Sequence, residues 1–182
     1  MKHEILKAIL DVGQHPTILS IDGPAGSGKT TLADELKFEL ENLSKTTHIV
    51  HMDDLYNGWE DALTSTLSER LLEIIKQSQT SFITYPVFDW VANAQGESRT
   101  IKTPEILILE GVGSGQAAIR NKVSLAIWIE VEPSLGLKRV LKRDGEGLLG
   151  FMTLWQEQQS AHFRTEGTMG AADYCLDGAP ST

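Results

Sequence analysis

The sequence predicts an α/β protein in which helices cover both faces of a mostly parallel, five-stranded sheet, a three-layer α/β/α arrangement. Two observations predict it. Short apolar segments alternate with longer segments of helical periodicity, and the apolar segments lack the polar–apolar alternation of half-exposed strands. The length of 182 residues suits one core, so the whole chain, 1–182, is predicted to be a single domain.

The first half of the chain has two predicted strands and three predicted helices. Apolar residues three and four positions apart indicate the helices, and short apolar or β-branched runs indicate the strands. The predicted elements are a helix over 1–12, a strand over 17–22, a helix over about 29–43, a strand over 47–52 and a helix over about 60–77.

The second half is predicted to contain a short strand over 81–85, which Pro86 should limit, and a polar turn over 93–99. Buried strands are predicted over 105–110 and 124–131, and helices over 134–144 and about 148–165. The tail, which contains Gly178 and Pro180, is expected to be loose.

Residues 23–30 read Gly-Pro-Ala-Gly-Ser-Gly-Lys-Thr, the spacing of a phosphate-binding loop, or P-loop. The glycines allow successive N–H groups to surround an anion, Lys29 carries a positive charge to the β- and γ-phosphates, and the Thr30 hydroxyl is a Mg²⁺ ligand. A chance glycine-rich turn is the alternative, but a strand before and a helix after favour the phosphate site. The predicted ATP-binding residues are Gly23, Ala25, Gly26, Ser27, Gly28, Lys29, Thr30 and Thr31.

Acidic residues follow or end two other predicted strands. Asp53 and Asp54 follow 47–52, where a carboxylate can bind Mg²⁺ or accept a proton from a substrate hydroxyl; the alternative is a helix cap or solvated turn. Glu110 ends 105–110 at the position of a Walker B acidic residue, and its alternative is a solvated strand end. Because the carboxyl ends of parallel strands form the site in such folds, the predicted metal ligands are Thr30, Asp53 and Glu110.

Arg139 and Arg143 lie four residues apart on a predicted helix, so they share one face. Guanidinium groups can grip phosphates and neutralise the charge that develops during transfer. With the glycines at 145, 147 and 150, the segment of about 134–150 is predicted to be a lid; a solvated basic face is the alternative. The predicted catalytic residues are Lys29, Asp53, Arg139 and Arg143.

Aromatic residues cluster after two of these strands. Tyr56 and Trp59 follow Asp53, and 85–90 contains Tyr85, Phe88, Asp89 and Trp90. Aromatic rings can sandwich a nucleobase and a carboxylate can hold sugar hydroxyls. The alternative, that the rings belong to the core, is slightly favoured for Trp90.

The composition argues against several functions. The net charge of −9 disfavours nucleic acid as a partner, which needs a basic surface. No apolar run approaches the roughly 18 residues of a membrane span, so no membrane partner and a cytoplasmic location are predicted. The single Cys175 cannot form an internal disulfide and is expected to be buried. The histidines lack the spacing of a metal site.

Five segments together resemble the uridine kinase and phosphoribulokinase-like family of P-loop kinases. They are 23–30, Asp-Asp-Leu-Tyr at 53–56, Tyr-Pro-Val-Phe-Asp-Trp at 85–90, Leu-Glu-Gly at 109–111 and the basic segment 138–144. The resemblance extends over about residues 17–145. The chain departs from the family pattern near its nucleoside-contact segment: Phe88 replaces a Tyr, and Asn93 stands about where the family has a His.

The resemblance implies a P-loop kinase fold, ATP or GTP with Mg²⁺ as cofactors, and a small-molecule substrate. It implies that Asp53 is the catalytic base, and because such kinases often self-associate, a homo-oligomer is a further expectation. The predicted substrate-binding residues are Asp53, Tyr56, Tyr85, Phe88 and Asp89.

Residues and resemblance together predict an ATP-dependent kinase that transfers the γ-phosphate to a hydroxyl of a nucleoside-like substrate. The acceptor alternatives are a nucleoside monophosphate and a non-nucleoside alcohol such as a sugar or a pantothenate-like compound. A P-loop NTPase switch without a small-molecule acceptor also remains open, as does a nucleotide-binding module without catalysis. The chain lacks an Asn-Lys-x-Asp guanine-reading motif, which disfavours a GTPase.

Overall fold

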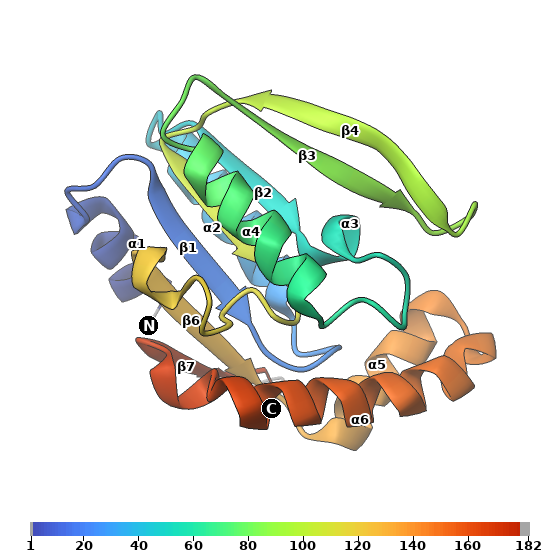
Figure 1. Ribbon diagram of the computed structural model, residues 1–182. Helices are drawn as coiled ribbons and strands as arrows, with labels where there is room; N and C mark the ends of the chain where they lie inside the picture. The colour runs from blue at the N-terminus through green and yellow to red at the C-terminus, as the bar shows by residue number, and fades with distance from the viewer. Residues whose placement is uncertain (1, 179–182) are drawn as a thin grey trace.

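The computed structural model describes residues 2–178 and contains a five-stranded sheet of order β2-β5-β1-β6-β7 (Figure 1). Every pairing within this sheet is parallel. The strands are β1 Thr17–Asp22, β2 Thr47–His51, β5 Ile106–Glu110, β6 Leu125–Glu130 and β7 Tyr174–Asp177.

Helices cover both faces of the sheet, so the three-layer prediction is confirmed (Figure 1). The side chains of β5 alternate between two cores: Ile106 and Ile108 pack with α1 and α2, whereas Leu107 and Leu109 pack on the side of α4 and α6. The helices are α1 Lys2–Asp11, α2 Lys29–Asn42, α3 Met52–Leu55, α4 Ser65–Gln77, α5 Pro133–Asp144 and α6 Leu149–Glu166, with 3₁₀ turns at Arg120–Lys122, Glu146–Leu148 and Met169–Ala171. No helix in residues 2–178 is long and apolar enough to span a membrane.

The carboxyl ends of the neighbouring strands β2, β5 and β1 meet at one edge of the sheet. In register, Glu110 at the end of β5 lies opposite Ile21 of β1 on one side and His51 of β2 on the other. The P-loop follows β1 and Asp53 follows β2, so this edge gathers the predicted phosphate and metal residues.

An antiparallel hairpin stands apart from the main sheet. Its strands are β3 Phe82–Asp89 and β4 Ala94–Lys102 (Figure 1). The predicted turn over 93–99 was therefore wrong, because β4 carries polar, largely exposed side chains on both faces and gives no apolar signal. Pro86 does not end β3; it lies within the strand opposite Ser98, beside a register irregularity that accommodates it.

Three other predicted features differ from the structure. The tail was expected to be loose, but Tyr174–Asp177 forms β7 by parallel pairing with β6, and this strand completes the main sheet in place of 81–85; Pro180 lies outside the described residues. Cys175 of this edge strand is exposed rather than buried. The helix expected from about residue 60 begins at Ser65, where the Thr64 hydroxyl accepts a hydrogen bond from the Thr66 N–H.

Candidate active site

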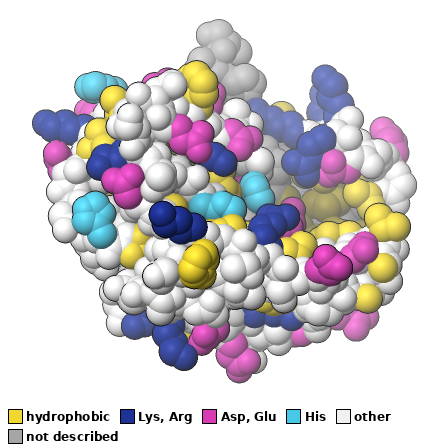
Figure 2. All heavy atoms as spheres, turned by 90° about the horizontal axis from the view of Figure 1, so that it is seen from above, with side chains coloured by type: hydrophobic (Ala, Val, Ile, Leu, Met, Phe, Trp, Pro, Cys, Tyr) yellow, Lys and Arg dark blue, Asp and Glu magenta, His cyan; other side chains and the backbone are white. Residues whose placement is uncertain are grey.

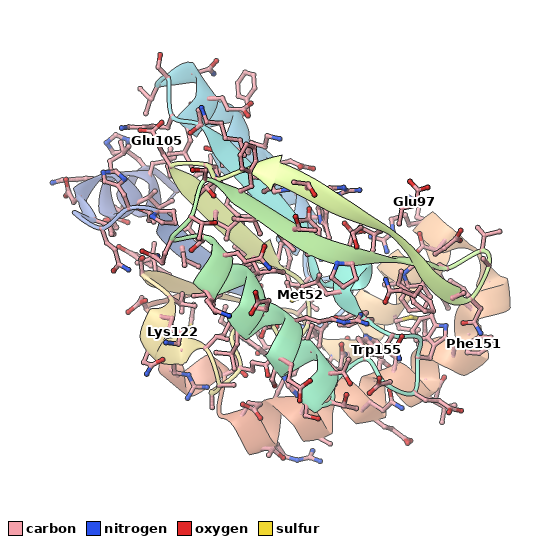
Figure 3. All side chains as sticks on the ribbon, turned by 45° about the horizontal axis from the view of Figure 1, so that its top comes forward. Met52, Glu97, Glu105, Lys122, Phe151 and Trp155 are labelled. Atoms are coloured by element: carbon pink, nitrogen blue, oxygen red, sulfur yellow. The ribbon has the colours of Figure 1, made fainter. Side chains whose placement is uncertain are left out.

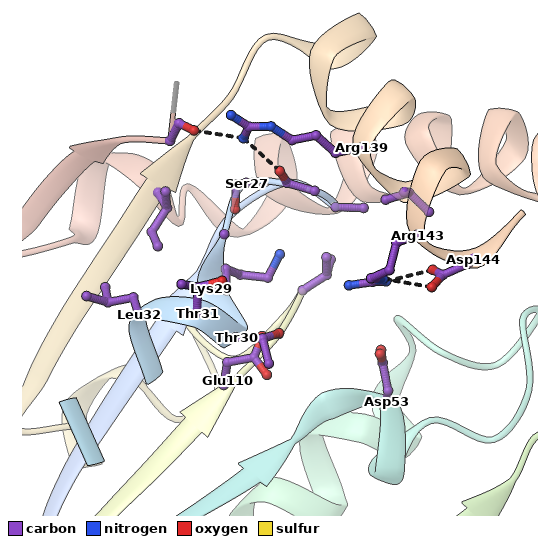
Figure 4. Close-up of a pocket in the computed structure, with 18 of the residues that line it drawn as sticks. Ser27, Lys29, Thr30, Thr31, Leu32, Asp53, Glu110, Arg139, Arg143 and Asp144 are labelled. Atoms are coloured by element: carbon purple, nitrogen blue, oxygen red, sulfur yellow. Dashed lines mark hydrogen bonds and ion pairs between the residues drawn. The ribbon is translucent and has the colours of Figure 1, made fainter. Parts of the chain in front are cut away.

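A cavity of about 910 Å³ opens at the carboxyl edge of the sheet (Figure 4). The P-loop, Asp53 and Glu110 line one part of it, and α5, α6 and the end of β7 supply further walls. From above, the molecule is visibly hollowed, with hydrophobic side chains on the floor of the recess (Figure 2). A cavity of this size can hold a nucleotide together with a small second substrate.

The P-loop needs its glycines for steric reasons. Gly26 and Gly28 have φ angles of 78° and 100°. A Cβ on Gly26 would also collide with the carbonyl oxygen of Gly136 on α5. The loop leads into α2, whose amino terminus therefore points its free N–H groups at the cavity.

Lys29 lies buried at the base of the loop, and its Nζ donates a hydrogen bond to the carbonyl oxygen of Pro24 at 2.8 Å. Burial lowers the pKa of Lys29, while the negative charges of Glu110, Asp22 and Asp53 oppose that shift. These carboxylates hold a cation at the bottom of the cavity, where it can meet a phosphate.

Glu110 connects two strands with the P-loop through a pair of hydrogen bonds. Its Oε1 accepts from the Thr30 hydroxyl at 3.1 Å, and its Oε2 lies 2.7 Å from Nδ1 of His51. This hydrogen bond raises the pKa of His51. Sequence reasoning gave His51 no role, although its place at the end of β2, two residues before Asp53, was an available signal.

The donor set fits Mg²⁺. A hydroxyl and a carboxylate lie in contact at Thr30 and Glu110, and hard oxygen ligands of this kind suit the ion. Within residues 2–178, no group of three or more His, Cys, Asp or Glu side chains could hold a metal by itself. A Mg²⁺ ion bound here would therefore take further ligands from phosphate and water, as it commonly does.

Asp53 and its neighbour Asp54 have different surroundings. Asp53 faces the cavity (Figure 4), whereas Asp54 forms an ion pair with Arg99 of β4 at 3.1 Å. Solvent in the cavity reaches Asp53, yet the protein around it raises its pKa by desolvation, and the charge of Glu110 raises the pKa further. A carboxylate with a raised pKa holds an abstracted proton better than an ordinary one.

Both predicted lid arginines come from α5 and line the cavity (Figure 4). One nitrogen of Arg139 donates to the carbonyl oxygens of Gly26 at 3.1 Å and Gly178 at 2.7 Å, so it joins the P-loop to the end of β7. Arg143 forms two hydrogen bonds of 2.7 Å with the carboxylate of Asp144.

The structure brings two of the predicted substrate-binding residues together. Asp53 and Tyr56 line the cavity, whereas Tyr85, Phe88 and Asp89 do not. The hydroxyl of buried Tyr85 lies 3.0 Å from Nε2 of His48, and the Asp89 carboxylate accepts the N–H groups of residues 91 and 92. Trp90, for which the core was slightly favoured, instead lines the cavity.

Two buried residues that sequence reasoning missed hold the phosphate loop. Gln159 of α6 accepts the N–H of Ala25 at 3.0 Å. Asp22 accepts N–H groups from Gly23 at 2.7 Å, Gly113 at 3.1 Å and Gly115 at 2.8 Å. An acidic residue ending the otherwise apolar run 17–22, directly before the first glycine, was the signal for Asp22.

Asp22→Ala is expected to destabilise the fold by at least about 3 kcal/mol, because three buried N–H groups lose their acceptor. Urea unfolding at pH 7 measures the change. Asp34→Ala, at an exposed position of α2, is the control and should stay within about 0.5 kcal/mol of wild type. Equal stabilities of the two variants would contradict the role of Asp22.

The same variant should also change the pH dependence of stability. Burial raises the pKa of Asp22 to about 6 from 3.8. The folded state therefore binds this proton more tightly than the unfolded state, and the resulting stabilisation is complete below about pH 4 and lost as the pH rises through 6. Asp22→Ala should therefore remove the part of the pH dependence of the free energy of unfolding that comes from this proton.

Comparison with known proteins gives relatives at modest identity. No family model matches the chain. A uridine kinase of Lactobacillus johnsonii is 29% identical over 149 residues, which cover 72% of this chain and 69% of that protein. A uridine kinase of Brevibacillus brevis is 27% identical over 150 residues, which cover 72% of this chain and 68% of that protein.

Solved structures share the fold across almost the whole chain. A protein described as a possible uridine kinase of Bacillus stearothermophilus aligns with a TM-score of 0.72 at 19% identity, covering 97% of each chain. A candidate fructose transport system kinase of Silicibacter sp. TM1040 aligns with a TM-score of 0.70 at 16% identity, covering 97% of this chain and 98% of the other. These relatives, together with the P-loop and the strand-end acids, support the resemblance of the chain to the P-loop kinases of the uridine kinase and phosphoribulokinase-like family.

Proposed function

We propose that the protein is a kinase that transfers the γ-phosphate of ATP to a hydroxyl group of a small molecule. The observation that carries this proposal is that Asp53 shares one cavity with Lys29 and with the Thr30–Glu110 pair. A carboxylate that can accept a hydroxyl proton thus lies beside groups suited to a triphosphate and its metal.

Each residue has a part in the proposed transfer. The loop amides and Lys29 bind the β- and γ-phosphates, and Thr30 and Glu110 hold Mg²⁺, which when bound neutralises charge on the phosphates. Asp53 orients the acceptor hydroxyl and takes its proton as the new bond from oxygen to the γ-phosphorus forms. The bond between that phosphorus and the β–γ bridging oxygen breaks, and its electron pair leaves with ADP. Arg139 and Arg143 are placed to stabilise the transferred phosphoryl group.

The relatives named uridine kinases favour a nucleoside-like alcohol as the acceptor. A nucleoside monophosphate and a non-nucleoside alcohol are the other acceptors to compare, and ATP must be compared with GTP. An NTPase switch would differ from all of these because it hydrolyses nucleotide without an acceptor.

Release of ADP from Mg-ATP in the presence of pyrimidine and purine nucleosides, their monophosphates, sugars and pantothenate tests the proposal. We expect one class of acceptor to raise the rate at least about tenfold over the basal hydrolysis, because the cavity gives the acceptor a fixed position beside the γ-phosphate. Phosphate incorporated into the acceptor, followed by mass spectrometry, must equal the extra ADP. Slow release that no acceptor changes would contradict the kinase and support the switch.

A further inference from the structure

His51 is the last residue of β2, and its side chain lies beside the candidate metal site without lining the cavity. The side chain is 37% exposed, so packing in the core does not account for its place. Its Nδ1 lies 2.7 Å from Oε2 of Glu110. An ionised carboxylate only accepts hydrogen bonds, so Nδ1 carries the hydrogen and donates it to Glu110. Any effect of His51 on a bound nucleotide therefore passes through Glu110.

The sheet places these two side chains against each other. The parallel pairing of β2 with β5 puts His51 opposite Glu110. Side chains alternate between the two faces of β2, and Ile49 packs in the core on the side of α2. Two residues further on, His51 faces that same side, where the first turn of α2 carries Thr30. Met52, the next residue, packs on the opposite face, in the core that α4 and the hairpin cover (Figure 3).

The carboxylate of Glu110 is held at both of its oxygens. Oε1 accepts from the Thr30 hydroxyl at 3.1 Å, and Oε2 accepts from His51. Among the described residues, these two are the hydrogen-bond donors to this carboxylate. A glutamate has one more rotatable bond than an aspartate, so a single donor would leave the carboxylate free to rotate about the bonded oxygen. Two donors on separate oxygens fix both its direction and its plane.

A cation of the P-loop competes for Glu110. Lys29 lies at the base of the same cavity, and the negative charge of Glu110 attracts it (Figure 4). Without the hydrogen bond from His51, the carboxylate is free to turn toward the Lys29 ammonium group. Such a pair would neutralise two groups that the phosphates and their metal require.

We propose that His51 is a positioning residue for the metal site, which holds the Glu110 carboxylate beside the Thr30 hydroxyl so that both oxygens are available to one Mg²⁺ ion. This inference rests on the part of the proposed function that assigns Thr30 and Glu110 to Mg²⁺. The ion demands near-octahedral geometry, so a ligand that must first be ordered binds it less tightly. Removing a group that orients a metal ligand commonly weakens metal binding by about 10- to 100-fold.

Calorimetric titration of a nucleotide with and without metal tests the proposal, because it separates metal binding from folding. The probe is AMP-PNP, or GMP-PNP if wild type binds that analogue more tightly, titrated once with saturating Mg²⁺ and once with EDTA. In His51→Leu, we expect the Kd with Mg²⁺ to rise about tenfold and the Kd in EDTA to stay within about twofold of wild type. Equal losses in the two titrations would indicate a structural role and overturn the proposal, as would a wild-type affinity that does not depend on Mg²⁺.

Two conservative variants identify the atom that carries the effect. Asparagine places an amide nitrogen near the position of Nδ1, so His51→Asn should recover most of the Mg²⁺-dependent affinity; glutamine reaches the position of Nε2, so His51→Gln should not. His48→Leu is the matched control, because His48 lies on the opposite face of β2 with its Nε2 3.0 Å from the Tyr85 hydroxyl. Equal Kd values with Mg²⁺ in the Asn and Gln variants would overturn the proposal, even if His51→Leu does not fold.

These titrations use no acceptor, so they are independent of the ADP-release assay. A Mg²⁺-specific loss in His51→Leu without acceptor-stimulated turnover in wild type would contradict the kinase and support the role of His51. No binding of either analogue to wild type would contradict both. In active enzyme, His51→Leu should raise the Mg²⁺ concentration for half-maximal rate about tenfold, with kcat at saturating Mg²⁺ within about threefold of wild type.

Discussion

Asp53→Asn is expected to lower kcat by about 10²- to 10⁴-fold, the range for loss of a positioned general base. Asparagine has nearly the same shape as aspartate but cannot accept the hydroxyl proton. Because Asp53 faces the cavity while Lys29 and the loop amides bind the phosphates, the Kd of Mg-ADP should change by no more than about threefold. Rapid-quench measurement of phosphoryl transfer, with calorimetric titration of Mg-ADP, checks both parts.

The adjacent carboxylate supplies a matched control. Asp54 differs from Asp53 by one position but forms an ion pair with Arg99 on β4, so Asp54→Asn should keep kcat within about twofold of wild type. A similar loss of kcat in both variants would point to a disturbed α3 rather than to a base. Retained turnover in Asp53→Asn would remove its assignment as the base.

Lys29→Ala is expected to lower kcat/KM for ATP by at least about 10³-fold and to weaken Mg-ADP binding. The ammonium group is the buried cation at the base of the phosphate loop, and electrostatic contacts of this kind commonly contribute two to three orders of magnitude or more each. Steady-state ADP release as a function of ATP concentration, with a saturating acceptor, measures the change.

The stability of this variant must be measured beside its activity, since Asp22, Asp53 and Glu110 lose the positive charge that faces them. Lys37→Ala on the same helix is the control: Lys37 is partly exposed and pairs with Glu41 at 3.9 Å. If Lys29→Ala remains folded by circular dichroism and still turns over at a rate near wild type, the P-loop does not act as proposed.

The features that were predictable from sequence are those encoded by a few consecutive residues. The P-loop spans residues 23–30. Its glycines adopt the positive φ angles that glycine allows, and Lys29 lies buried at the base of the loop, as expected. The positions of Asp53 and Glu110 followed from strand ends, because parallel strands present their carboxyl ends at one edge.

The features that were missed depend on pairing between distant segments. β4 exists because it pairs with β3, and β7 because it pairs with β6; neither needs an apolar pattern of its own. His51 and Asp22 were missed because their roles depend on hydrogen bonds with distant residues. His51 contacts Glu110, and Asp22 accepts from Gly113 and Gly115, about ninety residues further along the chain. The ring contacts of Trp59 with Phe151 and Trp155 were not predictable either, since Phe151 and Trp155 come from α6 and no local motif connects them with Trp59.

The hydrogen bond from Ala25 to Gln159 has a consequence for the order in which two ligands bind. Gln159 and Trp155 lie one turn apart on α6, so the helix that holds a P-loop amide also carries Trp155, which lines the cavity. Any shift of this turn that accompanies nucleotide binding moves Trp155 with it. The two ligands then have linked free energies, and by reciprocity each changes the affinity of the other by the same factor. If the acceptor site is completed only after the nucleotide has bound, few water molecules are held in place to compete with the acceptor hydroxyl. Hydrolysis of ATP in the absence of an acceptor would then stay low.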